Sequence, residues 1–163
     1  MPPASSGSPE MRAAPGLRPV CTLTVELSPI RELGRGRAGK RRIIPIVGGR
    51  VEGPELQGTI LNVGADWQTV YDDGCAFLDA RYAFETADGA IIEVVNKGFR
   101  HGPPEIIERL AAGEAVDPDD YYMRTAAHLE TGDPRYAWVN RTLFVGTGAR
   151  RPSAVEITLF AVA

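Results

Sequence analysis

Short runs with alternating polarity or β-branched residues, separated by turns, recur through most of this chain. The clearest turn signals are Asp72-Asp73-Gly74 and Asp88-Gly89, because Asp tolerates the left-handed backbone conformation and Gly adopts it freely. These two turns bracket a long strand-like run at residues 75–86. The second turn leads directly into residues 90–97 (AIIEVVNK), so the sequence predicts a β-hairpin there.

The same pattern predicts strands along the rest of the chain, with only one helix. The helix is expected over residues 104–112, where Pro104 suits the first turn and Gly113 ends it. Glycines 48 and 49 predict a tight turn between two strands. The predicted strands cover residues 20–27, 41–47, 50–52, 56–61, 65–71, 75–86, 90–97, 121–128, 136–147 and 154–162.

Eight to ten strands with one short helix indicate an all-β fold. We expect a closed antiparallel β-barrel, because closure removes the sheet edges that consecutive hairpins would leave exposed. A barrel of about eight strands has an interior just large enough for side chains and one small ligand. The short helix is expected to plug the barrel or pack against its sheet.

The 163 residues suit one domain, predicted over residues 20–163 after a disordered tail at 1–19 that is rich in Pro, Ser, Gly and Ala. A net charge of −3 gives no attraction to nucleic acid, and no apolar run is long enough to span a membrane. Cys21 and Cys75 have no metal-like spacing. We expect two free thiols and a cytoplasmic location.

Polar residues interrupt the apolar run at residues 136–147. Trp138 and Asn140 lie two residues apart and so share one face of the predicted strand. They could form an aromatic wall and a hydrogen-bonding anchor for a ligand. Alternatively, Trp138 fills the core and Asn140 satisfies a neighbouring backbone group. Tyr136 lies on the same face.

Asp66 is the candidate for proton transfer. Beside Trp67 at the start of a predicted strand, its carboxyl group could have a pKa raised by burial, as a general acid or base requires. The other interpretation is an exposed Asp66 in a loop. Arg81 shares a strand face with Asp79, where the two could serve the lumen or form an ordinary surface ion pair.

Further candidate ligand-binding residues lie in two other segments. Asn96 and His101 flank a glycine-containing stretch that could line a barrel mouth, and Tyr122 and Arg124 supply a phenol and a cation. The alternative for each is an ordinary surface position. Two distant histidines without spaced cysteines or carboxylates do not make a metal signature, so no metal site is predicted.

Five stretches together resemble one family, the DUF3237 family of small bacterial and fungal proteins. They are RRIIPIVGGRVEGPELQG (41–58), GADWQ (64–68), LDARYAFETADGA (78–90), NKGFRHGPPE (96–105) and ETGDPRYAWVNRTLFVGTG (130–148). Leu129 stands where the family usually has an aromatic residue, and Asn62-Val63 replaces a pair richer in Gly and Pro.

The resemblance implies a β-barrel akin to lipocalin-like and allene-oxide-cyclase-like barrels, often dimeric. It also implies a chemistry, since some fungal relatives act as cofactor-free cyclases on polyketide-type substrates. The family positions that it points to here are Asp66, Trp67, Arg81, Asn96, Tyr136, Trp138 and Asn140.

We therefore expect a cofactor-independent cyclase or isomerase that binds a small, partly hydrophobic oxygenated molecule. Asp66 would transfer the proton, with Asn140 and Arg81 or a Tyr stabilising the developing negative charge. The alternatives are a non-catalytic carrier or sensor with the same pocket and, less favoured, an oligomeric scaffold whose lumen is filled by its own side chains.

Overall fold

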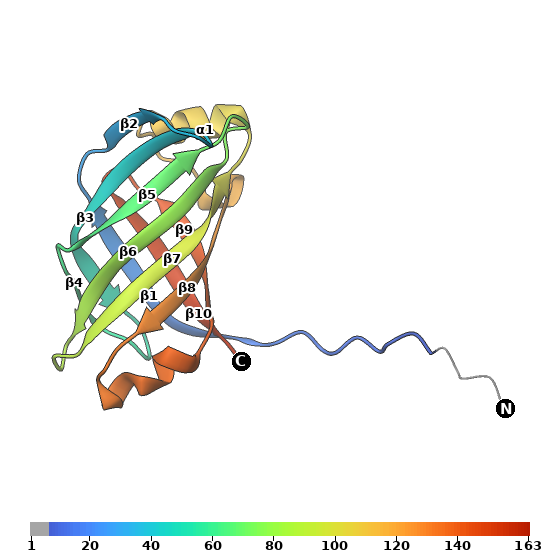
Figure 1. Cartoon of the computed structure of the whole chain (residues 1–163), viewed down its shortest axis with the longest axis vertical. Coiled ribbons are helices and arrows are strands. Elements are labelled where there is room, and N and C mark those ends of the chain that lie inside the picture. The colour runs from blue at the N-terminus through green and yellow to red at the C-terminus, as the bar shows by residue number, and fades with distance from the viewer. Residues whose placement is uncertain (1–6) are drawn as a thin grey trace.

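The strands close into an eight-stranded antiparallel barrel with two extra strands, as Figure 1 shows for the computed structural model. The structure describes residues 7–163. The predicted all-β barrel with one short α-helix is confirmed. The strands are β1 (Leu17–Leu27), β2 (Arg31–Arg35), β3 (Lys40–Glu52), β4 (Gly58–Ile60), β5 (Gly64–Val70), β6 (Ala76–Thr86), β7 (Ile91–His101), β8 (Tyr122–Glu130), β9 (Phe144–Arg150) and β10 (Ala154–Val162).

Closure depends on β1, which pairs with β10 on one side and with β3 on the other. From β10 the sheet continues through β9, β8, β7 and β6 by antiparallel neighbours. Between β6 and β3, β4 and β5 each pair with both strands. The two hairpins predicted at residues 72–74 and 88–89 are present, with φ of 85° at Gly74 and 92° at Gly89.

Helical segments lie at the two ends of the barrel (Figure 1). Helix α1 (Pro104–Ala111) lies at the same end as β2, with Ile106, Ile107 and Leu110 packed on the core. Gly113 follows it with a φ of 77°, a conformation that favours glycine. At the opposite end lies the 3₁₀ segment η2 (Pro134–Arg141), and η1 (Pro118–Asp120) precedes β8.

Alternation along the strands separates an inner face from an outer face. On β8, Met123, Thr125, Ala127 and Leu129 are buried, and the residues between them are exposed. The inward residues of the other strands complete a continuous apolar core that includes Leu23, Phe84, Ile92, Val94, Phe144 and Leu159. Phe84 and Phe144 are among the largest fully buried side chains, and Phe144 packs against Trp138 of the segment η2.

Three segments differ from their predicted structure. Residues 31–35, for which no strand was predicted, form β2. Residues 48–49 make no turn but continue β3 opposite Val25 and Glu26 of β1, and the β1–β3 register shifts directly before them, at Val47. Gly49 has a φ of 130°, and a Cβ there would clash with the Thr24 carbonyl oxygen, so glycine permits both the backbone bend and the close approach. Two consecutive glycines are therefore compatible with an irregular strand as well as with a turn.

The predicted strand at residues 136–147 is also wrong in its first half, which is η2 instead. Asp133 accepts a hydrogen bond from the Arg135 backbone N–H, and Pro134 occupies the first turn. This Asp-Pro pair is a helix-start signal that outweighs the apolar run after it. Only the second half of the segment, β9, is extended.

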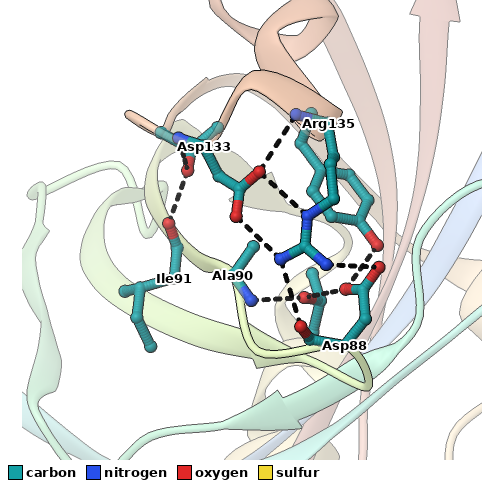
Figure 2. A network of polar contacts seen from close by, with 8 residues as sticks. Asp88, Ala90, Ile91, Asp133 and Arg135 are labelled. Carbon is teal, nitrogen blue, oxygen red and sulfur yellow. Dashed lines mark hydrogen bonds and ion pairs between the residues drawn. The ribbon is translucent and has the colours of Figure 1, made fainter.

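A network of polar contacts fastens η2 across the β6–β7 turn (Figure 2). The Arg135 guanidinium reaches both Asp133, at 2.8 Å, and Asp88, at 3.3 Å. The Tyr136 hydroxyl donates to Asp88 at 2.8 Å, and the Thr131 hydroxyl donates to the Ile91 carbonyl at 2.7 Å. These contacts hold η2 over the end of the barrel remote from α1.

The remaining sequence-based predictions concern the tail, the cysteines and membrane segments. The predicted disorder of residues 1–19 falls in part on residues 1–6, outside the described residues, and stays a prediction; β1 begins at Leu17. Cys21 and Cys75 are free thiols. Among the helices of residues 7–163, none has the length and apolar character needed to cross a membrane.

Asn140 supports η2 through its side chain, which accepts from the Thr131 N–H at 2.8 Å and donates to the Thr131 carbonyl at 2.9 Å. We predict that Asn140→Ala lowers the free energy of unfolding by about 1–2 kcal/mol, measured by urea denaturation, because both bonds are lost at a partly exposed site. The exposed neighbour Arg141 gives the control Arg141→Ala, which should change stability by less than about 0.5 kcal/mol. Equal stability of the two variants would contradict this role.

Candidate functional site

The lumen contains a small cavity between the apolar core and the α1 end of the barrel. Its free space is about 50 Å³, lined largely by apolar side chains such as Ile44, Leu78 and Ile157. Polar side chains from five strands also face it. They are Asp66 and Gln68 from β5, Tyr82 from β6, Asn96 and Arg100 from β7, Thr125 from β8 and Arg150 from β9.

The strand register places Asp66 and Asn96 on either side of a small residue. Asp66 lies opposite Ala80, and Ala80 lies opposite Asn96 on the next strand. All three line the cavity. The methyl group of Ala80 leaves space between the carboxylate and the amide, so both can reach a molecule in the lumen.

A chain of hydrogen bonds orients the Asp66 carboxylate. Gln68 donates to Asp66 Oδ2 at 2.7 Å and accepts from Arg42 Nε at 3.1 Å. The backbone N–H of Asp79 donates to Asp66 Oδ1 at 2.9 Å. Between Asp66 and Thr69, the residues of β5 are not paired with β6. The Asp66 side chain accepts the hydrogen bond from the Asp79 N–H at this interruption of the strand pairing.

Opposing effects act on the pKa of Asp66. Burial raises the pKa above the ordinary value of 3.8, and the nearby charge of Asp79 acts in the same direction. The hydrogen bonds from the Asp79 N–H and from Gln68 lower it, as does the positive charge of Arg100. The net shift is upward, which suits a group that must take up and return a proton.

Three buried side-chain oxygens in the lumen lack a hydrogen-bond partner within residues 7–163. They are the Tyr82 hydroxyl, Asn96 Oδ1 and the Thr125 hydroxyl, in residues with exposed fractions of 3, 4 and 6%. An unpartnered buried polar group costs about 1–3 kcal/mol, so such groups are rare. Three of them lining one cavity provide hydrogen-bonding capacity that a ligand could use.

Burial also affects the ionisation of Tyr82 and of two arginines. The pKa of Tyr82 is raised well above 10 by burial, so this hydroxyl stays protonated and can donate. The pKa of Arg100 is lowered to about 10 by burial and by the charges of Arg150 and Arg42. Burial and Arg42 likewise lower the pKa of Arg150. Both guanidiniums remain charged at neutral pH.

A wider cavity of about 560 Å³ lies at the α1 end and forms the mouth of the lumen. Arg100 and Arg150 line both cavities and so mark the junction between them. The mouth is bounded by β2 and the start of β3 on one side and by Ile107, Leu110 and Ala111 of α1 on the other. A ligand can therefore enter the lumen past the two arginines.

The structure places two of the sequence-predicted site residues in the lumen, Asp66 and Asn96. Asp66 is partly buried in β5 and does not lie in an exposed loop. Burial is the main cause of its raised pKa, as the sequence-based prediction required. Asn96 was predicted at a barrel mouth and lies deeper, beside Ala80 in the lumen wall.

Five other candidates lie on the outer face of the barrel. Trp67 is 45% exposed, and Arg81 is exposed on β6, facing away from the lumen. Tyr122 stacks on His101 with ring centroids 4.7 Å apart, and Arg124 lies over the Tyr122 ring at 5.6 Å. These side chains cannot reach a molecule inside the lumen, because each has the parity of the outward positions on its strand.

The last three candidates belong to η2 at the opposite end. Tyr136 bonds to Asp88, Trp138 packs against Phe144 with centroids 6.0 Å apart, and Asn140 bonds to Thr131. The interpretation in which Trp138 fills space and Asn140 satisfies backbone groups is therefore the one the structure supports.

Sequence reasoning missed Gln68, Tyr82, Arg100, Thr125 and Arg150. Four of them carried a usable signal, since each is a polar residue at the buried parity of an alternating strand. Thr125, for example, stands between Met123 and Ala127 on β8. Arg150 has the parity of the buried residues Phe144, Gly146 and Gly148, but it lies beyond residue 147, where the predicted strand ended. Residues 7–163 contain no group of three or more His, Cys, Asp or Glu side chains arranged to hold a metal ion.

Comparison with known proteins places this barrel among related chains. Residues 15–162 match the model of a family described as a protein of unknown function, DUF3237. A UPF0311 protein of Rhodopseudomonas palustris is 43% identical over 143 residues, which cover 88% of this chain and 94% of the relative.

Solved structures show the same fold. A conserved protein of unknown function from Rhodopseudomonas palustris superposes with a TM-score of 0.88 at 41% identity, over 94% of this chain and all of that one. A structure described as an enzyme from Penicillium herquei superposes with a TM-score of 0.73 at 21% identity, over 95% of this chain and 99% of that one. The second likeness concerns the fold alone.

We predict that the Asp66 carboxyl group titrates above pH 3.8 in the wild-type protein and higher still in Arg100→Met. The reason is that burial raises the pKa of Asp66, and the charge of Arg100 opposes that rise. Carbon-detected NMR of the side-chain carboxyl groups measures both values. Arg81→Met, on the outer face, is the control and should leave the titration unchanged. An Asp66 pKa at or below 3.8 would contradict the assignment.

Proposed function

The chain belongs to the DUF3237 family, and we propose that its lumen is the site of a cofactor-independent cyclase or isomerase. The substrate is a small, partly hydrophobic molecule with oxygen-containing groups. The observation that carries this proposal is the set of three unpartnered oxygens, of Tyr82, Asn96 and Thr125, which line the same cavity as Asp66. This combination supports binding of an oxygenated group beside a proton-transfer residue.

Asp66 acts as the base in the proposed reaction. Its ionised carboxylate takes a proton from a hydroxyl group or from a carbon next to a carbonyl group. The hydroxyls of Tyr82 and Thr125 donate hydrogen bonds to the oxygen on which negative charge develops, and Asn96 Oδ1 accepts from a substrate hydroxyl. Asp66 then returns the proton to a different atom, so the product is an isomer or a closed ring with the same atoms and the same oxidation level.

The environment of Asp66 supports this role in two ways. The raised pKa makes the carboxylate a stronger base than an exposed Asp. The hydrogen bonds from Gln68 and the Asp79 N–H hold the carboxylate in one orientation beside the cavity. Catalysis requires such fixed geometry, whereas simple binding does not.

A non-catalytic carrier or sensor is the second candidate, and the small volume of the lumen favours it. A free space of about 50 Å³ admits only part of a ligand, with the rest held in the mouth. Such a protein would bind the same molecule but leave it unchanged. In an enzyme Asp66 is required for turnover, whereas in a carrier it affects at most the affinity for the ligand.

We predict that Asp66→Asn lowers turnover by about 10²- to 10⁴-fold while leaving the fold and ligand binding nearly intact, because only proton transfer is removed. Native mass spectrometry of protein from its own host identifies the co-purifying compound. That compound is then incubated with fresh enzyme in D₂O, and the product is expected to carry one deuteron from the exchanged carboxyl group. The turnover rate of the wild-type enzyme should rise with pH through a pKa above 3.8, since Asp66 must be ionised to act as a base.

The matched control is Glu85→Gln, which also removes one carboxylate but on the exposed outer face of β6, away from the charges and hydrogen bonds that act on Asp66. It should turn over the compound like the wild type. Equal turnover by Asp66→Asn would exclude the role of Asp66. Binding by all three proteins without any product would identify a carrier.

We also infer a homodimer and a cytoplasmic location. Dimerisation is supported by an aromatic patch on the outer face, formed by Trp67, Phe77, Phe99, His101 and Tyr122 across β5 to β8. Exposed apolar patches of this kind are typical of protein interfaces. The cytoplasm is supported by the two free thiols and can be checked by cell fractionation of the host.

Phe99→Glu is expected to convert the dimer into a monomer in sedimentation-velocity experiments, because it introduces a charge into the aromatic patch. Ile91→Glu is the matched control, since Ile91 lies on the same strand with an exposed fraction of 49% against 47% for Phe99. Ile91→Glu should leave the dimer intact. A wild-type protein that sediments as a monomer at all concentrations would rule out the inferred dimer.

A further inference from the structure

Two arginines at the junction of lumen and mouth make no direct ion pair within residues 7–163, although the charge of Asp66 acts on both from a distance. Arg100 is only 7% exposed, and Arg150 is partly buried. Both line the lumen cavity and the mouth cavity. Within residues 7–163, the hydrogen bonds and ion pairs made by side chains include none from either guanidinium group.

Most of the arginines that pair with an acidic side chain lie on the surface. Arg18, Arg109 and Arg151 each pair with a glutamate at 2.8–3.3 Å, and all three are well exposed to solvent. Exposed arginines that form no ion pair within residues 7–163, such as Arg81 and Arg141, keep their charge in water, whereas Arg100 is buried and Arg150 is partly buried beside a cavity. A buried charge without a partner is costly, so this arrangement calls for an anion from outside the chain.

The charge balance around the cavities leads to the same conclusion. The two cavities are lined by five basic residues, Arg35, Lys40, Arg42, Arg100 and Arg150, against two acidic ones, Glu32 and Asp66. Arg35 is neutralised by Asp72 through two hydrogen bonds of 2.9 and 3.0 Å. An excess of two positive charges remains in a protein whose net charge is −3.

We propose that the ligand of this barrel is a carboxylate, whose two oxygens bind the guanidinium groups of Arg100 and Arg150 while its oxygenated end enters the lumen. The inference deepens the proposed function and rests on the lumen being a ligand site. The apolar remainder of the ligand lies in the mouth against Ile107 and Leu110 of α1.

A carboxylate fits the junction better than a phosphate does. Its two oxygens match the planar donor forks of two guanidiniums. A phosphate offers three terminal oxygens and needs further donors. Of the other basic residues that line the mouth, Arg42 already donates its Nε–H to Gln68 and Arg35 is paired with Asp72, which leaves Lys40 as a further donor.

The test compares levulinate, a small keto acid, with its uncharged methyl ester as probes of the full-length protein. Isothermal titration calorimetry at low salt is expected to show levulinate binding about ten- to hundredfold more tightly than the ester. Arg100→Met and Arg150→Met should each remove this preference. Arg81→Met, on the outer face of β6, should keep it.

Thermal unfolding separates recognition from a structural role. If Arg100 serves the ligand, Arg100→Met keeps or raises the melting temperature, because an unpaired buried charge is replaced by an apolar chain of similar length. A lower melting temperature together with unchanged levulinate affinity overturns the proposal. Inorganic phosphate that displaces levulinate at equal concentration overturns the assignment to a carboxylate.

The outcome for this inference is distinguishable from the outcome for the proposed function. Levulinate that binds no better than its ester, or an uncharged co-purifying compound, overturns the carboxylate inference alone. Such a compound can still be converted by the wild-type protein and not by Asp66→Asn, which would leave the proposed function in place. A compound that carries a carboxylate but is never converted supports the carboxylate inference and excludes the proposed enzymatic function.

Discussion

The pairing of β1 with both β10 and β3 is the interaction on which the rest of the structure depends. It joins residues from opposite ends of the chain, as in the contact of the Thr22 and Thr158 hydroxyls at 3.0 Å, and it closes the sheet into a barrel. Only a closed barrel has a lumen shielded from water. The raised pKa of Asp66 and the lowered pKa of Arg100 both arise from that shielding, so the chemistry of the site depends on closure.

Strand alternation then divides the polar side chains between two environments. Outward residues such as Lys97 and Asp79 form exposed ion pairs, which contribute little to stability. Inward polar residues are few, and three of them lack partners in an otherwise apolar interior. A chain selected for stability alone would fill these positions with apolar side chains, so their presence supports the proposed ligand site in this part of the barrel.

The acid and the arginines of the lumen are electrostatically coupled. The charge of Arg100 holds down the pKa of Asp66, which otherwise rises through burial. An anionic ligand at the arginines would offset that charge and allow the pKa of Asp66 to rise further. Binding would thereby strengthen Asp66 as a base at the moment when substrate is present, and an empty barrel would hold the weaker base. The two proposals thus describe one electrostatic system.

The sequence by itself predicted most of the strands, the β6–β7 hairpin and the single α-helix, because alternation and Asp-Gly turns are local properties of the chain. The closed barrel was predicted from the number of strands, since closure removes exposed sheet edges. The sequence also singled out Asp66 and Asn96. Only the tertiary structure decided the faces at residues 136–147, since the sequence leaves both faces of that segment mixed in polarity. It placed Trp138 and Asn140 in η2 rather than in the lumen, and it brought Arg100 and Arg150 to one junction. Such convergence of residues far apart in sequence depends on closure and register, which no local pattern encodes.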